Sequence, residues 1–191
     1  MIMKTGEDFQ PYNISEYTVA RHYNVDLNNQ IGEPHHYTGL FEFFRGCSPN
    51  DVIYIYMNCP GGNVITGQQI INSMNECPAH IVTVLDGMCM SLAPLILFSG
   101  DEIVVPDHGI IMFHDFSQGK GGGKGNELLS GAIAWNDFYK EMLLKYAKPF
   151  LNAREIDQIV KGQDLYFNAD ETRKRITKIM KDREKQQQAA E

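Results

Sequence analysis

The stretch that decides the fold is His80-Ile81-Val82-Thr83-Val84-Leu85-Asp86-Gly87-Met88-Cys89-Met90-Ser91-Leu92-Ala93-Pro94. Its first six residues are rich in β-branched and apolar side chains, which predicts a buried strand over 81–85. The apolar residues that follow predict a helix from Ser91 to Gly100. Ser91 therefore lies at a strand-to-helix junction, where free backbone N–H groups and the helix dipole favour developing negative charge.

Two neighbouring features extend this interpretation. Upstream, a strand-like stretch ends in Pro60-Gly61-Gly62, and glycine tolerates backbone angles that let a turn aim its own N–H group at the serine. Downstream, His114 closes the apolar run 110–113 and can serve as a base. A serine nucleophile, a base and two N–H donors for an oxyanion are the parts that acyl transfer needs.

Each of these residues also has an ordinary structural interpretation. A serine at a helix start is most often an N-cap, His114 can be a histidine of the core, and Asp164 can be a turn aspartate after Lys161-Gly162-Gln163. The order Ser, His, Asp does not decide the matter, because catalytic triads occur in several chain orders. From the residues alone, these alternatives stay open.

Outward from the serine, the chain alternates between two periodicities. Strands are predicted over 17–25, 51–58, 81–85, 103–105 and 110–113, and helices over 34–44, 64–77 and 91–100. This alternation is the signature of a largely parallel sheet covered by helices, the α/β class. The strands are nearly continuous apolar runs, which indicates that both faces of the sheet are buried.

The C-terminal half begins with the glycine-rich stretch 119–125. An apolar stripe then predicts a long helix that packs on something large; its members are Leu128, Ala132, Trp135, Tyr139, Met142 and Tyr146. Asn152 with Glu155, and Asn168 with Glu171, have capping-box spacing. They predict two further helices, of which the last is charged and frays.

Composition limits the function. The chain has 191 residues, 43% of them hydrophobic, which suits a single domain with a tail. A net charge of −7 argues against a nucleic-acid binder. The four cysteines form no Cys-x-x-Cys pair, no apolar signal segment stands at the start, and the longest apolar run, 92–98, is far shorter than the roughly 20 residues that span a bilayer. We therefore expect free thiols, a cytoplasmic location and no membrane contact.

Four segments, taken in order, resemble signatures of the proteolytic subunit of the Clp protease, the ClpP family of serine peptidases. They are the strand-plus-Pro-Gly-Gly segment Tyr54–Val64, the nucleophile motif Gly87–Ser91, the histidine strand Ile111–His114 and the third-member segment Gln163–Glu171. The resemblance covers roughly residues 17–172. It implies an α/β fold of ClpP/crotonase-like repeated β-β-α units. Residues 1–191 would form one domain, with a flexible segment over 1–16, a projecting handle (a strand plus a long helix) over 119–147, and a charged C-terminal helix or tail over 171–191.

The resemblance also implies roles for single residues. Ser91 would be the nucleophile, His114 the general base and Asp164 the acid that orients it, while the N–H groups of Gly62 and Leu92 would hold the oxyanion. The implied protein is a self-compartmentalised serine endopeptidase that needs no metal or organic cofactor of its own. Its partners would be further copies of itself in stacked heptameric rings, peptide and unfolded-protein substrates, and an AAA+ unfoldase that consumes the ATP.

Two departures from the family pattern keep other functions open. Leu92-Ala93-Pro94 replaces the family's Met-Gly-Ala, and Arg173–Met180 replaces its Tyr-Gly-Leu-Ile/Val-Asp ending. One alternative is a catalytically impaired ring subunit or decoy that binds another Clp component; another is a crotonase-type enzyme acting on acyl-CoA.

Three other residue sets were weighed as functional groups. Asp115 can replace Asp164 as the third member. Cys89 is expected to be a small core residue rather than a nucleophile. His35 and His36 are expected to be a surface pair with diverging rings, not metal ligands.

Overall fold

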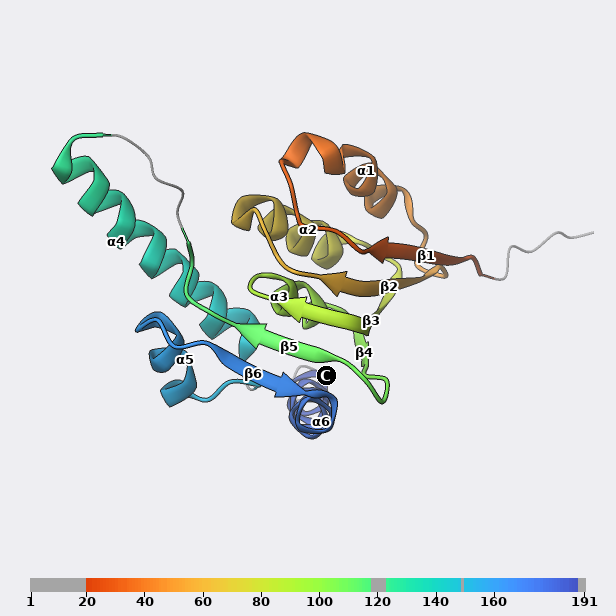
Figure 1. The fold of residues 1–191 in the computed structure, drawn as a ribbon. Helices are drawn as coiled ribbons and strands as arrows, with labels where there is room; N and C mark the ends of the chain where they lie inside the picture. Colours follow the sequence, from red (N-terminus) through yellow and green to blue (C-terminus); the bar gives the residue numbers. More distant parts are fainter. Residues whose placement is uncertain (1–19, 118–122, 149, 189–191) are drawn as a thin grey trace, which may run out of the picture.

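The computed structural model describes residues 20–117, 123–148 and 150–188 (Figure 1). In chain order the elements are β1 (His22–Leu27), the 3₁₀ helix η1 (Pro34–Tyr37), α1 (Thr38–Gly46), β2 (Val52–Cys59), α2 (Val64–Glu76), β3 (His80–Met90), α3 (Ala93–Leu97), β4 (Glu102–Val104), β5 (Ile110–Phe113), α4 (Gly125–Met142), the π-helical η2 (Leu143–Ala147), α5 (Ala153–Val160), β6 (Leu165–Asn168) and α6 (Ala169–Gln188). The predicted α/β alternation is confirmed. Of the regions expected to lie outside the core, 1–16 and 119–122 fall outside the described residues.

The strands form one six-stranded sheet in the order β1-β2-β3-β5-β6, with β4 paired to β3. Strands β1, β2, β3 and β5 run parallel, as predicted, and β6 pairs antiparallel with β5. The sequence did not predict β6, because the strand has only four residues, of which Phe167 alone is buried, and its place in the sheet depends on pairing with β5. A mixed sheet is thus formed around β3.

Strand β3 and helix α3 differ from the prediction. The strand was expected to end at Leu85 and the helix to run from Ser91 to Gly100, whereas β3 continues to Met90 and α3 spans Ala93–Leu97. The extension is held by tertiary pairing, since Cys89 lies opposite Cys59 of β2 on one side and Ile111 of β5 on the other. Local periodicity does not report such pairing.

The first strand also lies later than expected. It was predicted over 17–25, and β1 spans His22–Leu27, where its register against Val52–Met57 of β2 fixes it; residues 17–19 lie outside the described residues. Both capping predictions are confirmed. The Asn152 side chain accepts the N–H groups of Arg154 and Glu155, and Asn168 accepts the N–H of Glu171 at 2.9 Å.

The C-terminal elements close the core on β5. Four phenylalanines, Phe98, Phe113, Phe150 and Phe167, pack with ring centroids 4.7 to 6.2 Å apart. Helix α4 instead extends away from the sheet (Figure 1). Its buried residues are Tyr139 and Met142 near one end, whereas Leu129 and Ile133 are 64% and 54% exposed. In the described part of the chain, no helix is both long and apolar enough to cross a membrane.

Candidate active site

Ser91 follows the last residue of β3 in a strained turn. Its N–H donates to the carbonyl of Met112 on β5 at 2.8 Å. Its φ of +61° is the one positive value among the non-glycine residues that the structure describes, and the left-handed conformation costs about 1–2 kcal/mol for a residue with a Cβ. The N-cap of α3 is Leu92, with no side-chain cap bond, so Ser91 does not have the N-cap role that its position suggested.

The turn Pro60-Gly61-Gly62 packs directly on this serine. Gly61 has φ +89°, and a Cβ placed there would lie 2.6 Å from the Met90 carbonyl oxygen and 2.7 Å from Ser91 Cβ. Gly62 has φ +142°, and its Cβ would lie 2.2 Å from the carbonyl oxygen of Ile31. Glycine at position 61 therefore allows the turn to approach the serine this closely, and glycine at position 62 allows its contact with the backbone of Ile31.

Ile31 holds the turn from its other side. The Ile31 N–H donates to the Gly61 carbonyl, and the Asn63 N–H donates to the Ile31 carbonyl, each at 2.8 Å. This clamp joins the segment before η1 to the segment before α2. The sequence prediction missed it, because an isolated bridge of this kind has no periodicity that could show it.

The two N–H groups expected to hold an oxyanion are available. Among the hydrogen bonds that the described residues form, none uses the N–H of Gly62 or of Leu92 as donor. The nitrogen of Leu92 lies 3.2 Å from where a Cβ on Gly61 would stand, which brings the two segments into contact. Unpaired backbone donors beside a serine are suited to stabilise the charge of a tetrahedral intermediate.

His114 and Asp164 meet at the same edge of the sheet. The β3–β5 ladder ends at Met90 and Met112, so Ser91 and His114 follow the carboxyl ends of neighbouring parallel strands. The β5–β6 ladder pairs Phe113 with Leu165. His114 and Asp164 are the next residues beyond this last pair, so the antiparallel register brings their two segments together at the end of the ladder.

The three side chains are not bonded to one another. Within the described ranges, no hydrogen bond joins Ser91 to His114, and no ion pair joins His114 to Asp164 or Asp115. His114 is half-buried and Asp164 is exposed. The Asp115 carboxylate accepts the N–H of Phe116 at 2.8 Å. Catalytic hydrogen bonds are often long without substrate and tighten in the complex, so their absence here does not rule these residues out as a triad.

Cys89 does not compete with Ser91. It is fully buried, beside the equally buried Cys59. Burial, together with the neighbouring Cys59 thiol, raises the pKa of Cys89 well above its ordinary value, so the thiol stays protonated and un-nucleophilic. The interpretation of Cys89 as a core residue is confirmed.

The histidine pair differs from expectation in its geometry. His35 and His36 are exposed, as expected, but their ring centroids lie 4.0 Å apart, with the ring planes tilted by 56°. The expected divergence is wrong because the backbone fixes only the direction of each Cβ, whereas the side-chain torsions place the rings. In residues 20–117, 123–148 and 150–188, no three His, Cys, Asp or Glu side chains are grouped to hold a metal ion.

A pocket of about 300 Å³ adjoins the Pro-Gly-Gly turn. Gly62 and Asn63 form one wall, and the apolar side chains of Val64, Ile65, Phe116 and Trp135 form much of the rest. Trp135 comes from α4, so the projecting helix contributes to the surface beside the double-glycine turn.

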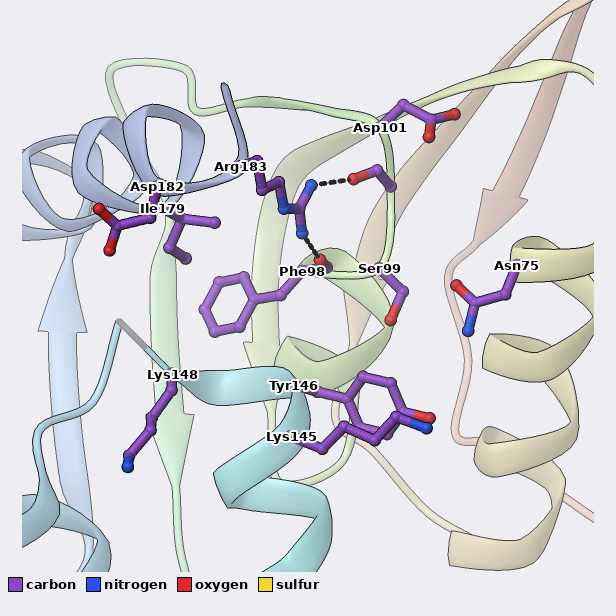
Figure 2. Close-up of a pocket in the computed structure, with 11 residues that line it drawn as sticks. Asn75, Phe98, Ser99, Asp101, Lys145, Tyr146, Lys148, Ile179, Asp182 and Arg183 are labelled. Carbon is purple, nitrogen blue, oxygen red and sulfur yellow. Dashed lines mark hydrogen bonds between the residues drawn. The ribbon is translucent and has the colours of Figure 1, made fainter. Parts of the chain in front are cut away.

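A second cavity, of about 380 Å³, lies at the opposite end of β3 (Figure 2). There Arg183 of α6 donates to the carbonyl of Gly100 at 2.6 Å and to that of Phe98. Burial lowers the pKa of Arg183, although the charge of Asp101 opposes this shift. Because none of the candidate catalytic residues lines this cavity, the guanidinium serves there to close the end of α3 against α6.

A strained serine against a double-glycine turn, with a histidine at the neighbouring strand end, defines an α/β protein with the layout of an acyl-transfer site. A family model described as Clp protease matches residues 35–175. Since this match covers well over half of the chain, the chain belongs to the Clp protease family. The resemblance noted in the sequence is thereby confirmed.

Curated relatives agree with this assignment. The chain is 34% identical over 108 residues to the "ATP-dependent Clp protease proteolytic subunit" of Chlorella vulgaris, covering 55% of this chain and 50% of that protein. It is 37% identical over 82 residues to the protein of the same name from Deinococcus radiodurans, covering 41% and 38%. It is 31% identical over 132 residues to "ATP-dependent Clp protease proteolytic subunit 3" of Rhodococcus jostii, covering 65% and 62%. The chain thus spans about half the length of the curated relatives it matches.

Proposed function

We propose that this chain is a serine endopeptidase and the proteolytic subunit of a Clp-type protease. The observation that carries the proposal is the strained turn of Ser91 packed on Gly61, with the N–H groups of Gly62 and Leu92 donating to no acceptor among the described residues. A turn that stores strain and leaves donors unpaired is costly for folding alone, and such features cluster at reactive sites. Membership of the Clp protease family supports the same assignment.

The proposed mechanism gives these groups the roles that they have in a serine peptidase. Ser91 Oγ attacks the scissile carbonyl while the His114 imidazole accepts its proton, and His114 then donates that proton to the leaving amine. The N–H groups of Gly62 and Leu92 hold the oxyanion of the tetrahedral intermediate. Water then hydrolyses the acyl-enzyme with His114 again as base. Asp164 orients the imidazole and stabilises its charged form.

We further propose the partners of this subunit. Residues 1–191 act as one peptidase domain whose handle, 119–147, packs against further copies of the chain in stacked heptameric rings. The exposed apolar residues Leu129 and Ile133 supply a surface for that packing. Since the relatives are named as ATP-dependent, an AAA+ unfoldase would consume the ATP and deliver unfolded proteins. The peptidase chemistry itself uses no metal or organic cofactor.

A second function is favoured by one observation. In the part of the chain that the structure describes, the three candidate side chains form no hydrogen bond or ion pair with one another. Leu92-Ala93-Pro94 also replaces the family's usual residues after the serine, where one of the proposed oxyanion donors stands. A ring subunit with impaired catalysis, which assembles with an active Clp subunit, would have the same fold.

Labelling with a fluorophosphonate distinguishes the two functions. We expect stoichiometric phosphonylation of Ser91, mapped by peptide mass spectrometry, with peptide hydrolysis that Ser91→Ala abolishes while assembly persists. The loss in rate should reach several orders of magnitude, as for removal of a triad serine. An unlabelled wild-type chain that co-assembles with an active subunit would establish the second function, and turnover retained by homogeneous Ser91→Ala protein would refute the assignment of the nucleophile.

A further inference from the structure

Tyr139 is the residue through which the projecting helix α4 contacts the backbone of the candidate base. Its side chain is 2% exposed. Its hydroxyl donates to the carbonyl oxygen of His114 at 2.8 Å. In α4, all of whose residues the structure describes, Tyr139 and Met142 are the buried ones. The end of the helix that is anchored in the core is therefore the end that contacts His114.

The backbone of His114 needs such an anchor. The ladder between β5 and β6 ends at Phe113, so His114 stands one residue beyond it. Residues 115–117 then have no regular secondary structure. The Asp115 carboxylate is occupied with the N–H of Phe116, whose ring centroid lies 6.5 Å from that of Tyr139. On this side of the histidine, Tyr139 is thus the buried contact that fixes the chain.

The tyrosine remains a donor under all conditions in which a peptidase would be assayed. Burial, helped by the nearby charge of Asp115, raises the pKa of the Tyr139 phenol above its ordinary value. A buried phenol is also expected to have a hydrogen-bond partner, because an unpaired hydroxyl in the core is costly. Here the partner is a main-chain carbonyl, so the bond constrains the backbone of His114.

We propose that Tyr139 is a positioning residue for His114, fixing through its hydroxyl the backbone from which the imidazole reaches Ser91. This inference rests on the proposed peptidase function. Tyr139 does not touch substrate or the reacting atoms; it acts through the histidine. A misplacement of about 1 Å in a catalytic group can cost about 100-fold in rate. Loss of one of several constraints on His114 should therefore lower kcat by about 10- to 100-fold.

The test compares two phenylalanine variants. Tyr139→Phe removes the hydroxyl and keeps the ring in the core. Tyr146→Phe is the matched control, because it also removes one tyrosine hydroxyl, in the adjoining η2 segment. Within the described residues, that hydroxyl accepts a hydrogen bond from Gln68 Nε2 at 3.1 Å and makes no bond to His114. For each variant we would measure kcat and KM on a fluorogenic peptide, the rate of Ser91 phosphonylation, the melting temperature and the sedimentation coefficient.

If Tyr139 positions His114, the measured quantities should change in a specific way. Tyr139→Phe should lose kcat and phosphonylation rate in parallel, with KM within about twofold of the wild type, because substrate binding is untouched. Tyr139→Phe should also have the sedimentation coefficient of the wild type. Tyr146→Phe should retain wild-type kcat, even if its melting temperature falls as far as that of Tyr139→Phe.

Other outcomes separate the two proposals. If the wild type turns over peptide and Tyr139→Phe does so with equal kcat, the positioning role is refuted and the peptidase function stands. The positioning role is also refuted if Tyr139→Phe loses kcat only when the assembly dissociates, or if Tyr146→Phe loses kcat equally. In both cases the loss of activity comes from altered packing. A wild type that neither hydrolyses peptide nor labels at Ser91 refutes the peptidase function and this inference with it.

Discussion

Replacing Gly61 by alanine tests the contact between the double-glycine turn and Ser91. The new Cβ would lie 2.6 Å from the Met90 carbonyl oxygen and 2.7 Å from Ser91 Cβ, and Gly61 has φ +89°. Gly162, which follows α5, has the same φ of +89°, and a Cβ there meets nothing within 4 Å. Gly162→Ala is therefore a control that carries the backbone strain without the steric overlap.

The two variants differ in expected magnitude. The left-handed conformation alone costs about 1–2 kcal/mol for alanine, which for a chain of this length lowers the melting temperature by about 2–8 °C. Gly61→Ala adds overlap with backbone atoms that cannot rotate away, at about 1–3 kcal/mol. Since the overlap is relieved by moving Ser91 or the neighbouring N–H donors, kcat should fall by about 100-fold or more, as when an oxyanion donor is lost.

The assays are thermal unfolding followed by circular dichroism and peptide hydrolysis at saturating substrate. We expect Gly162→Ala to lose stability and keep kcat, and Gly61→Ala to lose more stability and most of its activity. Equal melting temperatures for the two variants, together with wild-type kcat in Gly61→Ala, would show that the turn does not contact Ser91 closely enough to exclude a Cβ at position 61.

Three further predictions address the third triad member, assembly and acid stability. Asp164→Asn should lower kcat by roughly 10⁴-fold with an unchanged melting temperature, because the side chain is exposed; near-wild-type activity would give the role to Asp115. Ile133→Glu, at a position 54% exposed on α4, should sediment as single rings or smaller species, and unchanged sedimentation would count against assembly through this face. Burial alone would raise the pKa of Glu155, but hydrogen bonds from Arg175 and the Asn152 N–H outweigh it and leave that pKa below the usual glutamate value of 4.5. The stability that Glu155 contributes, about 1–3 kcal/mol for hydrogen bonds to a charged group, is therefore fully present above pH 4.5 and lost as pH falls through the lower folded-state pKa. The wild type should unfold at a higher urea concentration than Glu155→Gln at pH 7, and a gap that persists at acid pH would contradict this assignment.

Local patterns in the sequence determined much of the architecture. The strand over 110–113 is where it was expected, because an apolar run between turn residues needs no distant partner to be recognised. The capping box at Asn152 and the side-chain cap at Asn168 are likewise local, since each of these bonds spans three residues. The motifs around Ser91, Gly62 and His114 identified the family for the same reason: each is a short contiguous segment.

Tertiary structure decided what depends on residues far apart in the chain. β3 extends to Met90 because β2 and β5 hydrogen-bond its last residues from both sides. Ile31 holds the double-glycine turn through two backbone hydrogen bonds, and the register of β6 pairs Leu165 with Phe113, the residues next to Asp164 and His114. Tyr139 appeared in the sequence only as one apolar position of a helical stripe, although its phenol is a polar group that needs a partner when buried. Hydrogen bonds between segments tens of residues apart leave no periodicity in the sequence, so the pairing that brings the segments of Ser91, Gly62 and His114 together is defined only by the folded sheet.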